Sequence, residues 1–93
     1  MPEFRLVADV SSDDPGRIRP AIARLFPTGV TETPSGFHIE ATRSGESARE
    51  LNRAVLSALR NEERRTRIRS EWTSAGTVER FFDYVPKGVR PAR

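Results

Sequence analysis

Residues 3–10 have the sequence EFRLVADV, in which apolar residues occupy every second position. This period of two is typical of a β-strand that has one buried face and one face in contact with solvent. The apolar side consists of Phe4, Leu6, Ala8 and Val10, and the opposite side carries Glu3, Arg5 and Asp9. The chain is therefore predicted to begin with a half-buried strand, and the following segments must supply the layer that covers its apolar side.

The next segment has the period of a helix. Asp14 and Pro15 form its start, because Asp is a favoured N-cap and Pro fits the first helical position. Apolar residues then recur at helical spacing, at Ile18, Ile22, Leu25 and Phe26. Pro20 is expected to kink this helix or delay its start, and Pro27 and Gly29 end it.

A second helix follows a predicted capping box, in which Ser47 bonds the Glu50 amide and Glu50 reaches back. Apolar residues then occur four apart, at Leu51, Val55 and Leu59. The same interval recurs beyond Asn61, at Arg64, Ile68 and Trp72. The sequence thus predicts that helix resumes after Asn61, as one helix with the preceding segment or as two.

Strands account for the remaining apolar segments. Val30–Thr33 and Gly36–Thr42 flank the turn dipeptide Pro34-Ser35 and are expected to form a hairpin. Thr77–Val85 alternates as a last strand and is ended by Pro86. Phe81 and Phe82 in this strand point to opposite faces, so only one of them can face a common core.

The predicted order is β-α-β-β-α-β. The simplest packing is an α+β two-layer sandwich, ferredoxin-like or ribosomal-protein-five-like, with a four-stranded antiparallel sheet and both helices on one face. Residues 1–86 would form this single domain, and residues 87–93 a flexible basic C-terminal tail. The free sheet face would carry Arg5, Asp9, His38, Glu40 and, depending on register, Arg80 or Phe81.

Composition excludes several functions. The 93 residues contain no cysteine, which rules out disulfides and thiolate metal sites, and no apolar run approaches the ~18 residues of a membrane span. No secretory leader is recognisable, so a cytoplasmic protein is expected. His38 is the only histidine and lacks ligand partners at metal-binding spacing. With no Gly-rich phosphate loop and no nucleophile elbow, we expect no enzyme, no cofactor and no metal.

Charge is distributed unevenly along the chain. Residues 60–93 hold nine basic and five acidic residues, whereas residues 1–59 hold seven and eight. A basic end on a neutral body is the usual footprint of a protein that binds a polyanion. The candidate phosphate-binding residues are Arg60, Arg64, Arg65, Arg67 and Arg69, predicted on a helix, with Arg80 and Lys87 extending the patch. The alternative is a solvated helix end, in which Glu62 and Glu63 pair with these arginines.

Aromatic residues could stack unpaired bases, namely Phe37, Trp72, Phe81, Phe82 and Tyr84. The alternative is that aromatic residues in alternating strand positions belong to the core. The RNA-recognition-motif signature is missing, because Gly36-Phe37-His38-Ile39 lacks the basic first residue and the second aromatic.

Two stretches resemble a family of small archaeal proteins whose fold is like that of ribosomal large-subunit protein five. The first runs from Ala8-Asp9-Val10 through Asp14-Pro15 to Leu25-Phe26-Pro27. The second is the Arg-rich segment from Arg60 to Arg69-Ser70. The chain departs from the family at residues 83–88, where the family has a polar segment. The resemblance implies the same fold and, by fold analogy, RNA binding.

The sequence therefore predicts a small nucleic-acid-binding module, most simply for RNA, that contacts phosphates through an Arg-rich helix. A second interpretation is a protein–protein interaction or homodimerisation module, because so short a chain has few means to cover its aromatic side chains and sheet edges. A small-ligand sensor or enzyme is a third, and it would need a pocket that the sequence does not reveal.

Overall fold

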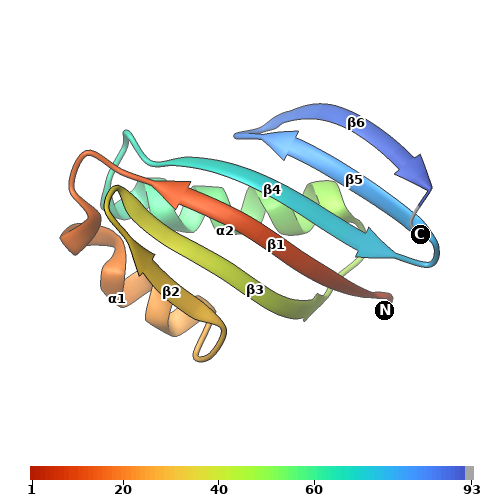
Figure 1. The fold of residues 1–93 in the computed structure, drawn as a ribbon, viewed down its shortest axis with the longest axis horizontal. Helices are drawn as coiled ribbons and strands as arrows, with labels where there is room; N and C mark the ends of the chain where they lie inside the picture. The colour runs from red at the N-terminus through yellow and green to blue at the C-terminus, as the bar shows by residue number, and fades with distance from the viewer. Residues whose placement is uncertain (92–93) are drawn as a thin grey trace.

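The computed structural model describes residues 1–91 and contains one antiparallel sheet with two helices against one of its faces (Figure 1). The strands are β1 (Glu3–Ser11), β2 (Val30–Thr33), β3 (Gly36–Ser44), β4 (Arg67–Ser74), β5 (Thr77–Phe82) and β6 (Val85–Pro91). The helices are α1 (Pro15–Leu25) and α2 (Ala48–Glu62). Neighbouring strands follow the order β2-β3-β1-β4-β5-β6, so β1 lies inside the sheet, between β3 and β4.

The core lies between the sheet and the two helices. The predicted apolar side of β1 is buried, with Phe4 the most exposed of its four residues at 7%. Ile18 and Ile22 of α1 and Leu56 and Leu59 of α2 pack into the same cluster. Trp72 of β4 is completely buried there and meets the ring of Phe4 edge-on. Burial of these side chains is the main favourable contribution to folding.

Both helices begin at the predicted caps, Asp14 and Ser47, but with only part of the predicted side-chain capping. Asp14 is the N-cap of α1 and Pro15 its first residue, although the Asp14 side chain makes no capping bond. Pro20 lies inside α1. The Ser47 hydroxyl accepts a hydrogen bond of 3.1 Å from the Glu50 amide, which is the predicted first half of the capping box.

The prediction of a four-stranded sheet is wrong, because the sheet has six strands. The segment predicted to resume the helix is instead β4, after α2 ends at Glu62. β4 turns back into β5 at Ala75 and Gly76, which both have positive φ, as a tight two-residue hairpin requires. Ile68 and Trp72 face inward in the observed strand as they would in the predicted helix, because residues four apart also face the same way in a strand.

The sixth strand lies where the sequence suggests a tail. Residues 87–91 belong to β6, which pairs with β5 after a turn at Asp83, whose φ is +56°. A bulge leaves Lys87 as an extra residue between the pairs Arg80–Gly88 and Phe81–Pro86. Residues 92 and 93 of the predicted tail lie outside the described residues. No helix among residues 1–91 is long and apolar enough to cross a membrane.

A buried polar cluster joins α2 to β4. The Asn52 side chain is 1% exposed, and its carbonyl oxygen accepts hydrogen bonds from the Ser70 hydroxyl at 2.6 Å and from the Trp72 ring nitrogen at 3.2 Å. Its amide nitrogen donates to the backbone oxygen of Asp83 at 2.7 Å. The two bonds to the Asn52 oxygen are buried, and within the described residues no buried side-chain polar atom lacks a partner.

No helix of residues 1–91 lies over the other face of the sheet, which we call the open face (Figure 1). Register decides which side chains it carries. Arg69 of β4 is paired with Phe82 of β5, and Glu71 with Arg80, so these four share the open face. Phe81 is 3% exposed in the core. Of the two candidates left open by the sequence, Arg80 is therefore the one on the open face.

Candidate functional site

Arg60 is the one predicted site residue whose side chain is committed within the fold. Its Nε donates to the backbone oxygen of Thr66 at 2.8 Å, and its Nη2 lies 3.3 Å from an Asp83 carboxylate oxygen. The guanidinium carbon also lies 5.2 Å from the centre of the Tyr84 ring. With its side chain only 29% exposed, Arg60 ties the end of α2 to the β5–β6 turn and has little freedom to contact a phosphate.

Arg64 and Arg65 lie in the turn between α2 and β4 and are exposed. Arg65 forms an ion pair of 3.4 Å with Asp13, in which both side chains are largely in solvent. Such pairs contribute little to stability and exchange readily with other partners. The two residues border a hollow of about 480 Å³ that is also lined by Asp13, Arg60 and Arg67. They extend the cationic surface beyond the end of the sheet.

Arg67 and Arg69 point outward from β4 on alternate positions, while Ile68 and Ser70 between and after them are buried. Two residues on one face of a strand lie about 7 Å apart along it. The Arg69 guanidinium carbon lies 5.5 Å from the centre of the Phe82 ring, which is only half-buried. This contact places a cation directly over an aromatic face.

Arg80, Lys87 and Arg90 continue the cationic surface onto β5 and β6. Arg80 and Arg90 both reach the same carboxylate oxygen of Glu71, at 3.5 and 3.6 Å. Lys87 is exposed and borders a hollow of about 420 Å³ together with Arg69 and Arg80. We call this region the basic half of the open face; its residues are Arg67, Arg69, Glu71, Arg80, Phe82, Lys87 and Arg90.

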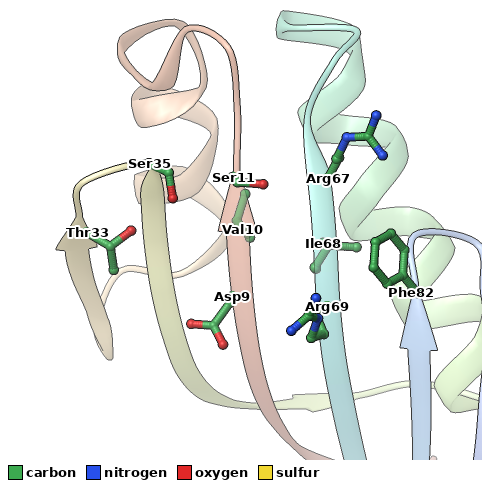
Figure 2. Close-up of a pocket in the computed structure, with 9 residues that line it drawn as sticks. All are labelled: Asp9, Val10, Ser11, Thr33, Ser35, Arg67, Ile68, Arg69 and Phe82. Carbon is green, nitrogen blue, oxygen red and sulfur yellow. The ribbon is translucent and has the colours of Figure 1, made fainter.

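A third hollow, of about 500 Å³, lies where β1 and β4 approach the edge of the basic half. Figure 2 shows Asp9 on β1 and Arg69 on β4 at the same level of the sheet, with the Phe82 ring beside Ile68. The hydroxyl side chains of Ser11, Thr33 and Ser35 complete its far side. The hollow thus combines an aromatic ring, two guanidinium groups and a carboxylate.

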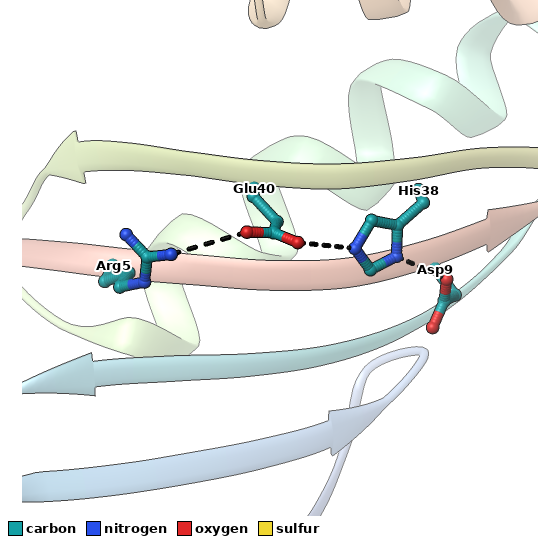
Figure 3. Close-up of polar contacts among 4 residues, drawn as sticks. All are labelled: Arg5, Asp9, His38 and Glu40. Carbon is teal, nitrogen blue, oxygen red and sulfur yellow. Dashed lines mark hydrogen bonds and ion pairs between the residues drawn. The ribbon is translucent and has the colours of Figure 1, made fainter. Parts of the chain in front are cut away.

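The charges over β1 and β3 are arranged differently, in a chain of paired side chains (Figure 3). Arg5 lies 3.4 Å from Glu40, Glu40 lies 3.0 Å from His38 Nε2, and His38 Nδ1 lies 2.8 Å from Asp9. We call these four residues the paired half of the open face. Both partners of His38 are carboxylates, which only accept, so the arrangement favours an imidazolium that donates from both nitrogens.

The hydrogen bond to Asp9, and then the bond to Glu40, raises the pKa of His38 above its ordinary value of 6.5. Within the described residues, no three histidine or acidic side chains come together in a way that could hold a metal ion.

The structure brings four of the seven predicted site residues onto one surface: Arg67, Arg69, Arg80 and Lys87. Arg64 and Arg65 lie at its end, where Arg60 lines the same hollow with its side chain bonded to Thr66 and Asp83. Sequence reasoning missed Arg90, because it assigned this residue to a tail. Arg67 and Arg69 alternate with Ile68, but Ser70 is polar, so the apolar residues Ile68 and Trp72 are four apart and fit a helix as well as a strand.

Comparisons of the chain with protein-family models, with curated proteins and with solved structures find no match. The resemblance to the archaeal family therefore stays a prediction, and the site must be interpreted from its own geometry.

Proposed function

We propose that this protein binds RNA through the basic half of the open face. The observation that carries the proposal is the gathering of five cationic side chains and one half-buried aromatic ring on a single helix-free surface, with Glu71 as the one acid among them. A polyanion gains from every cation that it neutralises, because counterions are released. Arginine adds geometry, since its planar fork can donate two hydrogen bonds to one phosphate.

The surface also suits unpaired nucleotides better than a rigid duplex. Bases of a single strand are free to stack on aromatic rings and on guanidinium planes, and Phe82 with Arg69 offers both. Arg67, Arg80 and Lys87 surround this pair and can hold the backbone. Phosphate contacts position the strand but carry no sequence preference.

The test is fluorescence anisotropy with a labelled single-stranded RNA of 12 nucleotides, titrated between 50 and 300 mM salt. We expect the logarithm of the binding constant to fall linearly with the logarithm of salt, with a slope of about −0.7 per phosphate contacted. Replacement of Arg67, Arg69 and Arg80 by Gln should weaken binding and reduce the slope by about two units.

The matched control replaces Arg24, Arg49 and Arg53 by Gln. These arginines are exposed on the helices, far from the open face in the fold, and their loss changes the net charge by the same amount. Equal losses in the two triple variants would mean that only net charge matters and would contradict a site on the open face. No binding at 50 mM salt would contradict the proposal altogether.

Homodimerisation is the second candidate, and the observation that favours it is the apolar exposure of edge strand β6. Val85 is 54% and Val89 is 65% exposed there. Pro86 and Pro91 weigh against pairing of this edge with a second copy, because proline cannot donate to a new ladder. Sedimentation at two concentrations tests it: a monomer at both would contradict it.

A further inference from the structure

Three kinds of side chain line the hollow between β1 and β4: an aromatic ring, a carboxylate and guanidinium groups. Its aromatic wall is Phe82, whose ring is directed to the open face and is left half-buried by the fold. The Arg69 guanidinium lies over this ring, so the two side chains form a stacked platform. Arg69 is the register partner of both Phe82 on β5 and Asp9 on β1, which fixes all three side chains in one row across the sheet.

The second wall is the carboxylate of Asp9. Its Oδ1 is held by His38 at 2.8 Å, and the side chain is still 68% exposed. Within the described residues, no side chain is bonded to Asp9 Oδ2, and no ion pair joins Asp9 to Arg69. An ionised carboxylate can only accept hydrogen bonds, so this oxygen is a ready acceptor for an N–H group.

The third wall is cationic. Arg67 is exposed at the rim of the hollow and is paired in register with Ser11 on β1. The platform, the carboxylate and this guanidinium therefore surround one space. Its volume of about 500 Å³ is within the usual range of small-ligand sites.

We propose that this hollow binds one unpaired RNA base that carries an exocyclic amino group. The base stacks on the Phe82–Arg69 platform, its amino group donates to Asp9 Oδ2, and its phosphate lies against Arg67. This inference rests on the proposed function and adds a base preference to it. Adenine, cytosine and guanine have an exocyclic amino group. The ring N–H of uracil lies between two carbonyl oxygens, so a carboxylate that approaches it also meets two acceptors that repel it.

The experiment compares four labelled RNA octamers by anisotropy at 100 mM salt: an octamer of uridine, and the same octamer with one central adenosine, cytidine or guanosine. The intact protein should bind the three amino-bearing octamers about five- to tenfold more tightly than the uridine octamer. Asp9→Ala should bind the uridine octamer at least as tightly as the intact protein and discriminate less than twofold.

The matched control is Glu40→Ala. It also removes one carboxylate bonded to His38, but Glu40 is not part of the hollow, so the base preference should persist. Phe82→Leu should weaken binding of all four octamers by about fivefold or more, because one stacked base is lost. If Phe82→Leu alters the urea unfolding midpoint strongly, Phe82→Trp replaces it, and tighter binding of all four octamers is then expected.

The outcomes separate the two proposals. Equal affinity for all four octamers, or a base preference that survives Asp9→Ala, would overturn the base-binding inference and leave RNA binding intact. Failure of every octamer to bind, even at 50 mM salt, would overturn RNA binding itself.

Discussion

The two halves of the open face lie on the same sheet and are both exposed to solvent, but they differ in how their charged side chains are paired. In the paired half, every charged group has an opposite partner within 3.4 Å. In the basic half, Glu71 is the one carboxylate among five cations, and of these it contacts Arg80 and Arg90. Like charges held together oppose folding by repulsion, whereas the paired half is neutral within itself. The proposal of RNA binding by the basic half rests on this difference, whereas the charges of the paired half stabilise one another.

Reversing the charge of the basic half should have the largest effect. The double variant Arg67→Glu with Arg69→Glu places two acids on β4 beside Asp9, so RNA affinity at 100 mM salt should fall by about a hundredfold or more. Anisotropy measures the loss. The comparison variant, Arg49→Glu with Arg53→Glu on α2, should lose much less; a similar loss would mean that net charge, and not the basic half, determines the affinity.

Separating structural from surface arginines sharpens the comparison. Arg60→Gln breaks the contacts of a partly buried guanidinium with Thr66 and Asp83 and should lower the free energy of unfolding by about 2 kcal/mol. RNA affinity should stay within twofold of the intact protein. Arg67→Gln should weaken RNA binding and leave the free energy of unfolding nearly unchanged. Urea unfolding and anisotropy on both variants provide the check. If both variants lost stability and RNA affinity to the same extent, Arg60 and Arg67 would not have different roles.

Neutralising the acids of the paired half should make it resemble the basic half. Asp9→Asn with Glu40→Gln leaves Arg5 without its partner, so affinity for a uridine octamer should rise by about threefold at 50 mM salt. The gain should disappear at 300 mM salt, where such charges are screened. A gain that persists at high salt would point to a new contact and not to the field of the surface.

Stability of the paired half should depend on pH through His38. Because the folded pKa is raised above 6.5, protonated His38 stabilises the fold; this contribution is complete below pH 6.5 and is lost as pH rises through the folded pKa. The stability difference between the intact protein and His38→Gln should therefore shrink from pH 6 to pH 9 in urea unfolding. A difference that does not change with pH would show that the two hydrogen bonds are not charge-assisted.

The smallest effect is expected at the exposed pair of Arg65 and Asp13. Arg65→Gln should change the free energy of unfolding by less than about 0.5 kcal/mol, because both side chains are mostly in solvent. Thermal unfolding is sufficient to check this. A larger loss would indicate that the turn after α2 depends on this pair.

The sequence predicted correctly those elements whose local pattern is compatible with only one type of secondary structure. Alternation in β1, the turn at Pro34-Ser35 and the cap at Ser47 each specify a single local structure, and each is confirmed. The segment from Arg64 to Trp72 has no such signal, because a spacing of four suits a helix and a strand equally. β6 was missed because Pro86, Gly88 and Pro91 disfavour strands, although an edge strand tolerates them.

The candidate site was predictable as a set of residues but not as a surface. The sequence gathers Arg67 and Arg69 with Arg80 and Lys87 by charge, and the hairpin of β4 and β5 then places them on one face. Arg60 has the same charge and a nearby position in the chain, but its role depends on Asp83 and Tyr84, which lie more than twenty residues further on. Long-range contacts of this kind leave no local pattern.

Asn52 has a consequence for the direction in which the arginines of β4 point. A strand that slips by one residue turns every side chain to the opposite face. Such a slip would move Ser70 and Trp72 away from Asn52 and leave its buried amide oxygen without partners, and it would turn Arg69 toward the helices. The hydrogen bonds of one buried side chain on the covered side thus select the register of β4, and in that register the cations of β4 face outward.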